Sequence, residues 1–390
     1  MKDITKAEKH LIHAYNRNLN LVSGHDVYLV DDEGQEYLDF AAGIAVSALG
    51  YSNETYKNAL KEQVDTLIHT SNLYFNQPSI EASEKFAKAS GMDKVFFTNS
   101  GAEAIEGAIK LARKYAYTKN PESAGHIVAM EHSFHGPTMG ALSVTGTEKY
   151  RTPFEPLIGG VSFAEYNNLD SVRKTVTEDT CAVIMEVVQG EGGIYTPEQE
   201  FLEGVRALCD EKDICLIFDE IQCGMGRTGS MFAYQQFGVK PDILTSAKAL
   251  GCGVPVGAFA AVDKVATALV PGDHGSTYGG NPLATRAVST VFDIFEQENL
   301  LEHVQEMGAY LWEQLETIQT EFDVVKEHRG IGLMQGLELH VPAADIVKKV
   351  LAQHVILISA GTNVIRFVPP LVIEKEHIDT MCSALRKALA

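Results

Sequence analysis

The strongest constraint on the fold is an alternation of short apolar runs with amphipathic helical patterns. Helical patterns such as 102–116 and 198–213 separate runs that are apolar throughout and have the length of a strand. Continuous apolar strands between helices indicate a sheet that is buried on both faces and mostly parallel, which predicts an α/β domain. The runs are VFFT (95–98), IVAME (127–131), AVIMEV (182–187), CLIFD (215–219), ILTSA (243–247) and AFAAV (258–262).

The two ends of the chain have a different pattern. Near the N-terminus, VYLVDD (27–32) and EYLDF (36–40) are joined across Glu33 and Gly34 as in a hairpin. After Pro282, two long helices (about 283–298 and 300–319), short strands near 324–328, 333–339, 355–359 and 364–368, and a helix from about 374 are predicted. A chain of 390 residues suits two domains. We expect a large domain at 56–280 and a smaller α+β domain formed by 1–55 and 281–390.

Composition excludes several classes of partner. Acidic residues outnumber basic ones by 52 to 32, and the formal charge is -20, which argues against nucleic acid and anionic membranes. No run approaches the roughly 18 apolar residues of a membrane span, and the N-terminus lacks the apolar core of a signal peptide. We expect a cytoplasmic enzyme that acts on small molecules.

Cysteine and histidine usage indicates neither a disulfide framework nor a metal site. The six cysteines form no CxxC pair and lie mostly in apolar runs, as expected of reduced, buried thiols. His132 and His135 lie three residues apart, but no cysteine or acidic cluster accompanies them. We therefore expect no metal.

The segment Asn99–Ala102 is a candidate phosphate site. It follows the run VFFT and opens the helical pattern that begins near Ala102. A strand, a tight turn and a helix N-terminus present unpaired N–H groups at the positive end of the helix dipole, and Ser100 can add a hydroxyl. No GxxxxGK[ST] or GxGxxG motif is present, so a single phosphate group fits better than a nucleotide. An ordinary capped helix remains the alternative.

Asp219 ends the run CLIFD. Ligands of parallel α/β sheets bind beyond the C-terminal ends of the strands, where a carboxylate is desolvated unless it meets a cation. A protonated pyridine nitrogen is one such cation, and Gln222 can face the same cleft. Alternatively, Asp219 and Glu220 cap the following turn.

Lys248 follows the run ILTSA and precedes a glycine-rich turn. Small and apolar residues flank it, whereas most lysines are solvated surface charges. A lysine in such surroundings has a lowered pKa and can form a Schiff base.

Taken in order, several motifs resemble the class III aminotransferases of pyridoxal-phosphate fold type I. The resemblance runs from about residue 15 to the C-terminus, and the acetylornithine aminotransferases resemble this chain in length and in the ending NVIRFVPPLVI (363–373). Each motif alone is weakly specific, but six in sequence are highly specific. The motifs are NSGAEAIEGAIKLARK, HSFHG, EVVQGEGG, FDEIQCGMGRTG, SAKALGCGVPVGA and HGSTYGGNP.

The resemblance implies a bound pyridoxal 5'-phosphate and a role for each residue around it. Lys248 would carry the cofactor as a Schiff base and move the substrate proton. Asp219 would pair with the ring nitrogen and Gln222 with the ring oxygen. Ser100, Gly101 and Ala102 would hold the phosphate, and Phe134 would stack on the ring. Thr277 would reach the phosphate of the neighbouring subunit, with Ser276 near the substrate, which implies a homodimer with a shared active site.

The resemblance also implies two substrates. Arg366 would bind a carboxylate of glutamate or 2-oxoglutarate, and Glu191 would pair with Arg366 when the amine donor enters. The implied reaction moves the ω-amino group of N-acetylornithine, a related acyl-ornithine or ornithine to 2-oxoglutarate, in arginine biosynthesis. The alternatives are an ω-aminotransferase for ornithine, 4-aminobutyrate or a diamine, and a cofactor-binding paralogue with impaired catalysis.

Pro137 departs from the family pattern. The phrase Phe134–Thr138 usually has arginine at the position of Pro137, and that arginine would bind a carboxylate of the acylated donor. Proline has neither a charge nor a side-chain donor. The departure makes a donor without a distal carboxylate more plausible.

Overall fold

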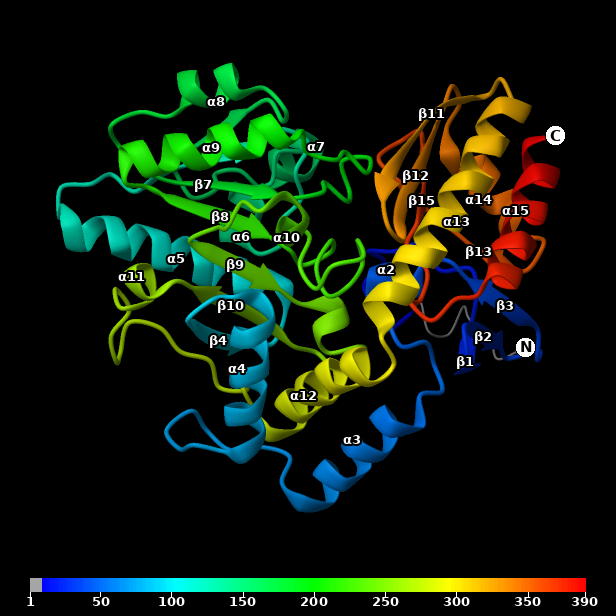
Figure 1. Cartoon of the computed structure of the whole chain (residues 1–390), viewed down its shortest axis with the longest axis horizontal. Helices are drawn as coiled ribbons and strands as arrows, with labels where there is room; N and C mark the ends of the chain where they lie inside the picture. The colour runs from blue at the N-terminus through cyan, green and yellow to red at the C-terminus, as the bar shows by residue number, and fades with distance from the viewer. Residues whose placement is uncertain (1–8) are drawn as a thin grey trace.

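A seven-stranded sheet forms the centre of the larger body in Figure 1, a computed structural model that describes residues 9–390. Neighbouring strands are parallel except that β10 runs antiparallel to β4 and β9. The mostly parallel sheet predicted from the apolar runs is confirmed, whereas the reversed direction of β10 and the strand β6 were not predicted. From edge to edge the strands are β4 (Lys94–Thr98), β10 (Gly257–Ala261), β9 (Ile243–Ser246), β8 (Cys215–Asp219), β7 (Thr180–Glu186), β5 (His126–Met130) and β6 (Val161–Ala164).

Both faces of this sheet are buried because alternate residues of each strand pack into different cores. Ile127 and Ile217 pack with the apolar side of α5 (Gly101–Lys119). Val128 and Phe218, their neighbours in sequence, belong to the second core, which includes the buried side of α9 (Gln199–Lys212). This arrangement explains why the strands read as continuous apolar runs.

Further helices surround the large sheet. Helix α5 approaches it closely at Gly107, where an added Cβ would lie 2.2 Å from the ring of Phe259 on β10. The remaining elements of this body are α3 (Glu54–Thr66), α4 (Gln77–Ser90), α6 (Met139–Ser143), α7 (Glu148–Arg151), η1 (Thr152–Phe154), α8 (Leu169–Thr175), α10 (Tyr234–Phe237), η2 (Lys248–Leu250), α11 (Asp263–Ala266) and α12 (Pro282–Gln297).

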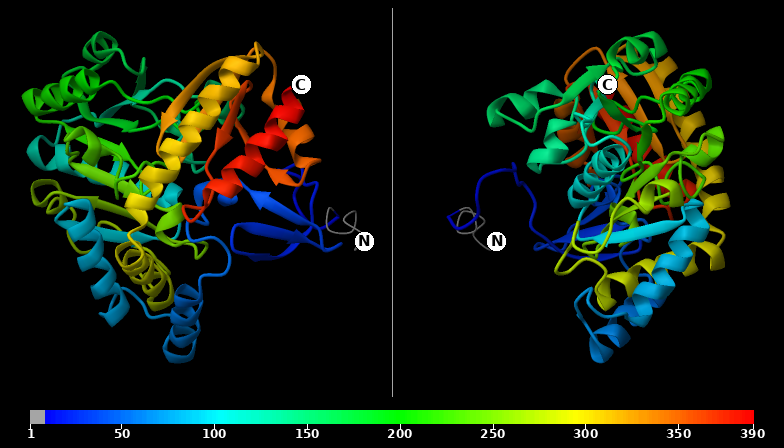
Figure 2. Two further views of the ribbon diagram at one scale, coloured as in Figure 1. Left: turned by 45° about the vertical axis from the view of Figure 1, so that its right-hand side comes forward. Right: turned by 90° about the vertical axis from the view of Figure 1, so that its left-hand side faces the viewer.

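The smaller body contains two four-stranded sheets. One is antiparallel, in the order β11 (Val325–Ile331), β12 (Met334–Leu339), β15 (Val364–Phe367) and β14 (Ile358–Ala360), and α13 (Leu300–Glu321), α14 (Ala343–Leu351) and α15 (Lys375–Leu389) belong to the same body. The other contains β1 (Leu21–His25), the predicted hairpin β2 (Tyr28–Asp31) and β3 (Glu36–Asp39), and β13 (Val355–Ile356). Because β13 pairs with β3 in parallel, strands from both ends of the chain share one sheet. The segment that leads into β1 extends away from the body of the fold (Figure 2).

Arg227 connects the two bodies. It lies in the loop after β8, is 1% exposed, and donates to the backbone carbonyls of Leu333 (3.1 Å) and Pro369 (2.5 Å) in the smaller body. Burial lowers the pKa of Arg227 to about 9. A buried cation that donates to two carbonyl groups holds the junction in one geometry.

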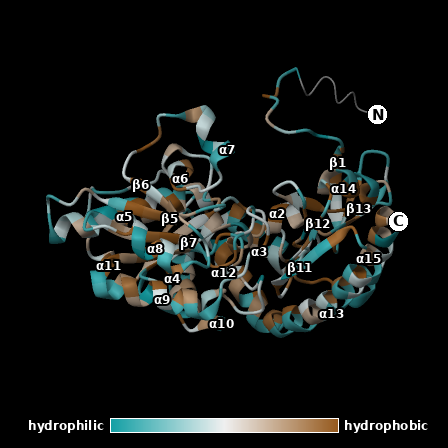
Figure 3. Cartoon of the chain, turned by 90° about the horizontal axis from the view of Figure 1, so that it is seen from above, coloured by the Kyte–Doolittle hydropathy of each residue, from teal (hydrophilic) through white to brown (hydrophobic). Residues whose placement is uncertain are grey.

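The distribution of side chains agrees with the sequence pattern. Figure 3 shows hydrophobic residues gathered in the strands of the large sheet, with hydrophilic residues on the outer surfaces of the helices. All six cysteines are free and buried, as predicted. Among residues 9–390, no helix is both long enough and apolar enough to cross a membrane.

Candidate active site

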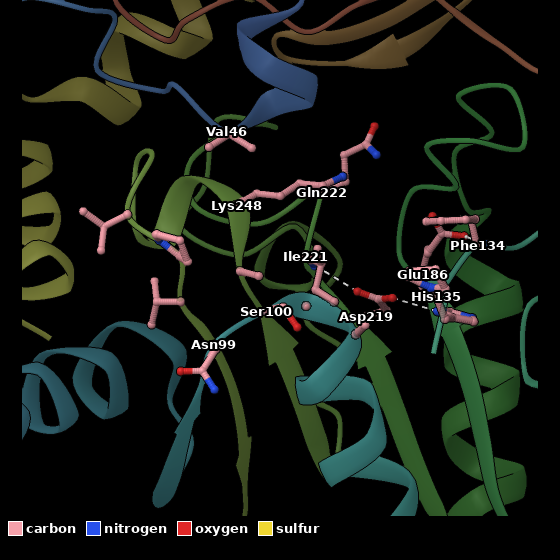
Figure 4. Close-up of a pocket in the computed structure, with 18 of the residues that line it drawn as sticks. Val46, Asn99, Ser100, Phe134, His135, Glu186, Asp219, Ile221, Gln222 and Lys248 are labelled. Atoms are coloured by element: carbon pink, nitrogen blue, oxygen red, sulfur yellow. Dashed lines mark hydrogen bonds and ion pairs between the residues drawn. The ribbon is translucent and has the colours of Figure 1, made fainter. Parts of the chain in front are cut away.

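A cavity of about 310 Å³ opens at the C-terminal ends of the central parallel strands (Figure 4). Strands β7, β8 and β9 end in or just before the lining residues Glu186, Asp219 and Lys248, and the start of α5 closes the floor. Val46, which follows α2 (Ala42–Ala45), contributes an apolar side chain from the N-terminal segment. This is the place at which parallel α/β sheets bind their ligands.

Lys248 extends its side chain into this cavity toward Gln222 (Figure 4). It lies two residues after the end of β9, and its φ of 50° is in the left-handed region, which turns the chain sharply at this point. Burial and the nearby positive charge of Arg366 lower the pKa of Lys248 to about 8. About a tenth of the amine is therefore neutral and nucleophilic at pH 7, far more than for an ordinary lysine.

Asp219 is held by three donors. Its Oδ2 is 2.7 Å from Nδ1 of His135, and its Oδ1 accepts from the N–H of Ile221 at 2.9 Å and from Oγ1 of Thr245 at 3.2 Å. The Ile221 contact shows that Asp219 also caps the turn after β8, so the two interpretations offered by the sequence are compatible. Burial disfavours a charged imidazole, but the hydrogen bond and charge of Asp219 outweigh this effect and raise the pKa of His135.

The phosphate-loop residues Asn99, Ser100, Gly101 and Ala102 line one end of the cavity. Ser100 is the N-cap of α5, and its Oγ accepts from the N–H of Glu103 at 3.2 Å. Its hydroxyl hydrogen is still available to a ligand. A Cβ added to Gly101 would lie 2.9 Å from Cδ1 of Ile221, so the loop packs directly against the turn after Asp219. The N-terminus of a 19-residue helix therefore lines the cavity, and a helix N-terminus presents unpaired N–H groups to a ligand.

Phe134 lies on the side of the cavity away from the phosphate loop. The centroid of its ring is 5.7 Å from that of Tyr150, and the two rings meet edge to face. Its N–H donates to Oε2 of Glu186 at 3.1 Å. Glu186 is 5% exposed, and burial raises its pKa to about 7.

Arg366 approaches from β15 of the smaller body and forms a bidentate ion pair with Glu191. Nη1 lies 2.6 Å from Oε1 of Glu191, and Nη2 lies 3.2 Å from Oε2. Nη1 also donates to Oε1 of Gln222 at 2.9 Å, so Gln222 links this pair to the cavity that it lines. Burial alone would raise the pKa of Glu191, but the charge and hydrogen bonds of Arg366 lower it. The two groups therefore neutralise each other.

Thr277 lies outside the cavity lining of its own chain. It is exposed on the loop between α11 and α12, beside the half-buried Ser276. Oγ of Ser276 accepts from the N–H of Gly279 at 2.9 Å and from Nδ2 of Asn99 at 3.2 Å, so the loop is anchored next to the phosphate loop.

Pro137 lines the cavity beside Phe134. The lysine and the arginine that lie nearest to Pro137 in the sequence, Lys149 and Arg151, contact other groups. Arg151 donates to the carbonyl of Thr145 at 3.0 Å and covers the ring of Phe163, and Lys149 lies over the ring of Tyr150. In this conformation neither replaces a charge at position 137.

No role in the cofactor site was predicted for His135, Glu186 or Val46, all of which line the cavity. His135 was considered only as a metal ligand, and Glu186 was included in a strand without any role. The signal was available for Glu186, since it ends an apolar strand as Asp219 does. Val46 gave no such signal, because a turn in which Ala42, Ile44 and Ala45 have φ of 49°, 67° and 63° brings it to the cavity. Over the described residues, no group of three His, Cys, Asp or Glu side chains is placed to hold a metal ion.

Residues 12–389 match the family of class-III aminotransferases. The chain belongs to this family. It is 46% identical to the acetylornithine aminotransferase of Methanocaldococcus jannaschii over 94% of this chain and 92% of that protein. It is 47% identical to the acetylornithine aminotransferase of Aquifex aeolicus over 95% and 97%.

Solved structures of two aminotransferases have the same fold. The N-acetylornithine aminotransferase from Stenotrophomonas maltophilia K279a is 36% identical with a TM-score of 0.85, over 96% of both chains. The ornithine aminotransferase from Toxoplasma gondii ME49 is 30% identical with a TM-score of 0.95, over 99% of this chain and 94% of that one. The predicted pyridoxal-phosphate fold type I is confirmed.

The cofactor of class-III aminotransferases is pyridoxal 5'-phosphate, and a further structure of the Toxoplasma gondii ornithine aminotransferase shows partial occupancy of pyridoxal phosphate at its active site. The residues of this chain fit such a group. The cavity offers an amine with a lowered pKa, a buried carboxylate fixed by three donors, and a helix N-terminus for a phosphate.

Proposed function

We propose that this class-III aminotransferase moves the ω-amino group of N-acetylornithine, or of a related acyl-ornithine or ornithine, to 2-oxoglutarate. The products are the semialdehyde and glutamate, and the implied pathway is arginine biosynthesis. The observation that carries the proposal is the bidentate pair of Arg366 and Glu191 close to Lys248. The relatives named acetylornithine aminotransferase support the choice of donor.

The pair of Arg366 and Glu191 suits two substrates that use one site in turn. With Glu191 moved aside, Arg366 offers two parallel donors to a carboxylate of 2-oxoglutarate or glutamate. With Glu191 in place, the arginine is neutralised, and an ω-amine that has no neighbouring carboxylate can enter. Because Gln222 donates to Glu191 and accepts from Arg366, it helps to hold both side chains of the pair in place.

The remaining cavity residues would hold the cofactor. Asp219 would keep the ring nitrogen protonated, and Gln222 would donate to the ring oxygen. Ser100, Gly101 and Ala102 would bind the phosphate, and Phe134 would cover the ring face. Bound pyridoxal phosphate supplies an electron sink that stabilises negative charge on the amine carbon of the substrate.

Lys248 would attach the cofactor through Nζ and then act as the proton carrier. An amine with a pKa of about 8 accepts and releases protons near neutral pH, as a general acid and base must. Val46 and Pro137 line the same cavity with apolar groups, which would help to exclude water from it during the transfer.

We further propose a homodimer in which Thr277 and Ser276 complete the partner's site. Leu73, Tyr74 and Phe75 are 86%, 71% and 93% exposed, and an apolar segment of this kind marks an interface. Asn72, next to this segment, donates to the carbonyls of Ser276 and Gly279 at 3.0 and 2.9 Å. A partner that covers the segment therefore also fixes the loop that carries Thr277.

We propose the predicted division into a cofactor-binding domain at 56–280 and a small domain formed by 1–55 with 281–390, with the difference that α12 packs against α3 and α4 of the larger body. Arg366 belongs to the small domain and Lys248 to the large one. A relative movement of the two would change the distance between the carboxylate site and the amine site.

A panel of amine donors tests the function. The purified protein, loaded with pyridoxal phosphate, is given 2-oxoglutarate and N-acetylornithine, ornithine, 4-aminobutyrate or putrescine, and glutamate is measured. We expect N-acetylornithine to give the highest kcat/KM. A clear preference for 4-aminobutyrate or putrescine would favour the ω-aminotransferase alternative, for which the apolar Pro137 is the specific observation. If no donor yields glutamate, the remaining alternative is a cofactor-binding paralogue with impaired catalysis.

A further inference from the structure

Glu186 is a buried carboxylate whose two oxygens are both used. Oε2 accepts from the N–H of Phe134 at 3.1 Å, and Oε1 accepts from the N–H of Gly190 at 3.0 Å. The residue lines the cavity at the end of β7 and is 5% exposed. A carboxylate in such a place is unfavourable unless its hydrogen bonds compensate for lost hydration, so these two bonds account for its presence.

The two N–H donors belong to the two loops that carry functional side chains. Phe134 and His135 lie on the loop after β5, and Glu191 directly follows Gly190 on the loop after β7. The loops also touch each other, since a Cβ added to Gly192 would lie 2.5 Å from the carbonyl oxygen of His132. One carboxylate therefore fastens both loops at their point of contact.

Glu186 also lies beside Asp219, the carboxylate that would pair with the ring nitrogen. In the parallel pairing of β7 with β8, Glu186 is the register partner of Asp219. Glu186 accepts a hydrogen bond from the N–H of Phe134. The next residue is His135, whose Nδ1 lies 2.7 Å from Oδ2 of Asp219. A shift of Phe134 would therefore move the imidazole that orients Asp219.

We propose that Glu186 is a positioning residue that sets Phe134, His135 and Glu191 around the cofactor by fastening the loops after β5 and β7. The proposal deepens the proposed function and rests on it. Glu186 itself touches neither substrate in this scheme. It determines how the ring is covered and how Glu191 is presented to Arg366.

The chain provides a matched control in Glu220. This carboxylate is also buried and also accepts from two N–H groups, those of Ala233 at 2.8 Å and Tyr234 at 2.7 Å. Burial raises its pKa to about 7, as for Glu186. It follows Asp219 in the chain, but it fastens a loop outside the cavity lining. A general loss of stability should therefore be similar in the two variants.

The experiment compares Glu186→Gln with Glu220→Gln. An amide has one acceptor oxygen, and its NH₂ group would face the second N–H, so each variant loses one of its two loop contacts. Apoprotein is prepared from parent and variants and is titrated with pyridoxal 5'-phosphate, and its thermal unfolding is recorded without cofactor. Visible circular dichroism of the loaded protein reports the orientation of the bound ring.

We expect Glu186→Gln to raise the Kd for pyridoxal phosphate about tenfold and to change the visible dichroism. Glu220→Gln should leave both near the parental values, although both variants unfold at a lower temperature than the parent. A parental Kd and dichroism in Glu186→Gln, or equal changes in the two variants, would overturn the proposal. If Glu186→Gln does not fold, Glu186→Asp is tested instead. Its side chain is shorter by one methylene, so the carboxylate oxygens lie farther from both N–H groups, and the same outcomes decide the proposal.

The parent protein separates this proposal from the proposed function. If the parent binds no pyridoxal phosphate, the proposed function fails. If the parent binds it tightly and Glu186→Gln does so equally well, only the role of Glu186 fails. A second readout is the ratio of the rates of the two half-reactions. When Glu186 no longer fastens the loop that carries Glu191, the half-reaction with the amine donor should slow more than the half-reaction with 2-oxoglutarate. Glu220→Gln should leave this ratio unchanged.

Discussion

Nη1 of Arg366 lies 2.6 Å from Oε1 of Glu191, in a pair that joins the smaller body to the loop after β7. The arginine is 2% exposed and its Nη1 also meets Gln222 at 2.9 Å, so water does not reach it freely. In the proposed reaction, this pair opens when a substrate carboxylate takes the place of Glu191. Under this proposal, the exchange of one carboxylate for another would let the two substrates use the same site in turn.

Removal of Glu191 should separate the two half-reactions. Glu191→Gln leaves Arg366 charged and open, so the KM for 2-oxoglutarate should fall or stay the same while the KM for the amine donor rises about tenfold. Single-turnover kinetics of each half-reaction provide the measurement. Equal changes in both would contradict the exchange.

Lys248 should be the site of covalent attachment. Borohydride reduction of the loaded protein followed by peptide mapping should place the cofactor on Lys248, and Lys248→Ala should bind it only non-covalently. The physical reason is an amine with a lowered pKa at the centre of the cavity. A label on any other lysine would refute the assignment.

The attachment should depend on pH in a predictable direction. Only the neutral amine attacks the aldehyde, and the pKa of Lys248 is lowered from 10.5 to about 8. The rate at which apoprotein takes up pyridoxal phosphate covalently should therefore rise with pH through about 8 and level off above it. Stopped-flow absorbance at a series of pH values measures this rate. A midpoint near 10.5 would show that the amine is an ordinary exposed lysine.

The sequence predicted the part of the site that depends on strand ends. Asp219 and Lys248 follow apolar runs, and the ends of parallel strands meet at one edge of a sheet, so their proximity was expected and is observed. The roles of Arg366 and Glu191 came from family resemblance, because no local pattern connects residues 175 positions apart. The bonds of Glu186 and His135 depend on how two loops pack, which no periodicity encodes. The direction of β10 was also missed, because an apolar run such as AFAAV does not state its direction.

Asp219→Asn should lower kcat by about 10²–10³-fold, since the neutral side chain no longer holds a proton on the ring nitrogen. The fold should remain, because the amide oxygen can still accept from Ile221. Steady-state kinetics with circular dichroism of the apoprotein test both parts. Undiminished turnover would mean that another group holds that proton.

Thr277→Ala should weaken cofactor binding if the partner's threonine completes each site. Binding and assembly are then linked, so dilution of the parent should have the same effect. Thr267→Ala is the matched control, because Thr267 is also exposed and its hydroxyl donates to the nearby carbonyls of Asp263 and Lys264. Ultracentrifugation combined with cofactor titration measures the linkage. A monomer that binds the cofactor as tightly as the parent would refute it.

Pro137→Arg should improve binding of N-acetylornithine. An arginine–carboxylate contact in a partly desolvated cleft contributes roughly 1.5–3 kcal/mol, or about 10–150-fold in KM. The half-reaction with glutamate, which Arg366 would hold, should change little. Pro137→Ala separates charge from backbone relaxation, since relaxation would also appear with alanine. Equal kinetics of the parent and Pro137→Arg would mean that the donor is bound by another route.

The most direct measurement follows the nitrogen itself. N-acetylornithine labelled with ¹⁵N at the ω-amine is incubated with 2-oxoglutarate and either the loaded parent or Lys248→Ala, and glutamate is analysed by mass spectrometry. Transfer through this site predicts ¹⁵N in the glutamate formed by the parent and no labelled glutamate from Lys248→Ala. Labelled glutamate from Lys248→Ala, or none from the parent, would contradict the account.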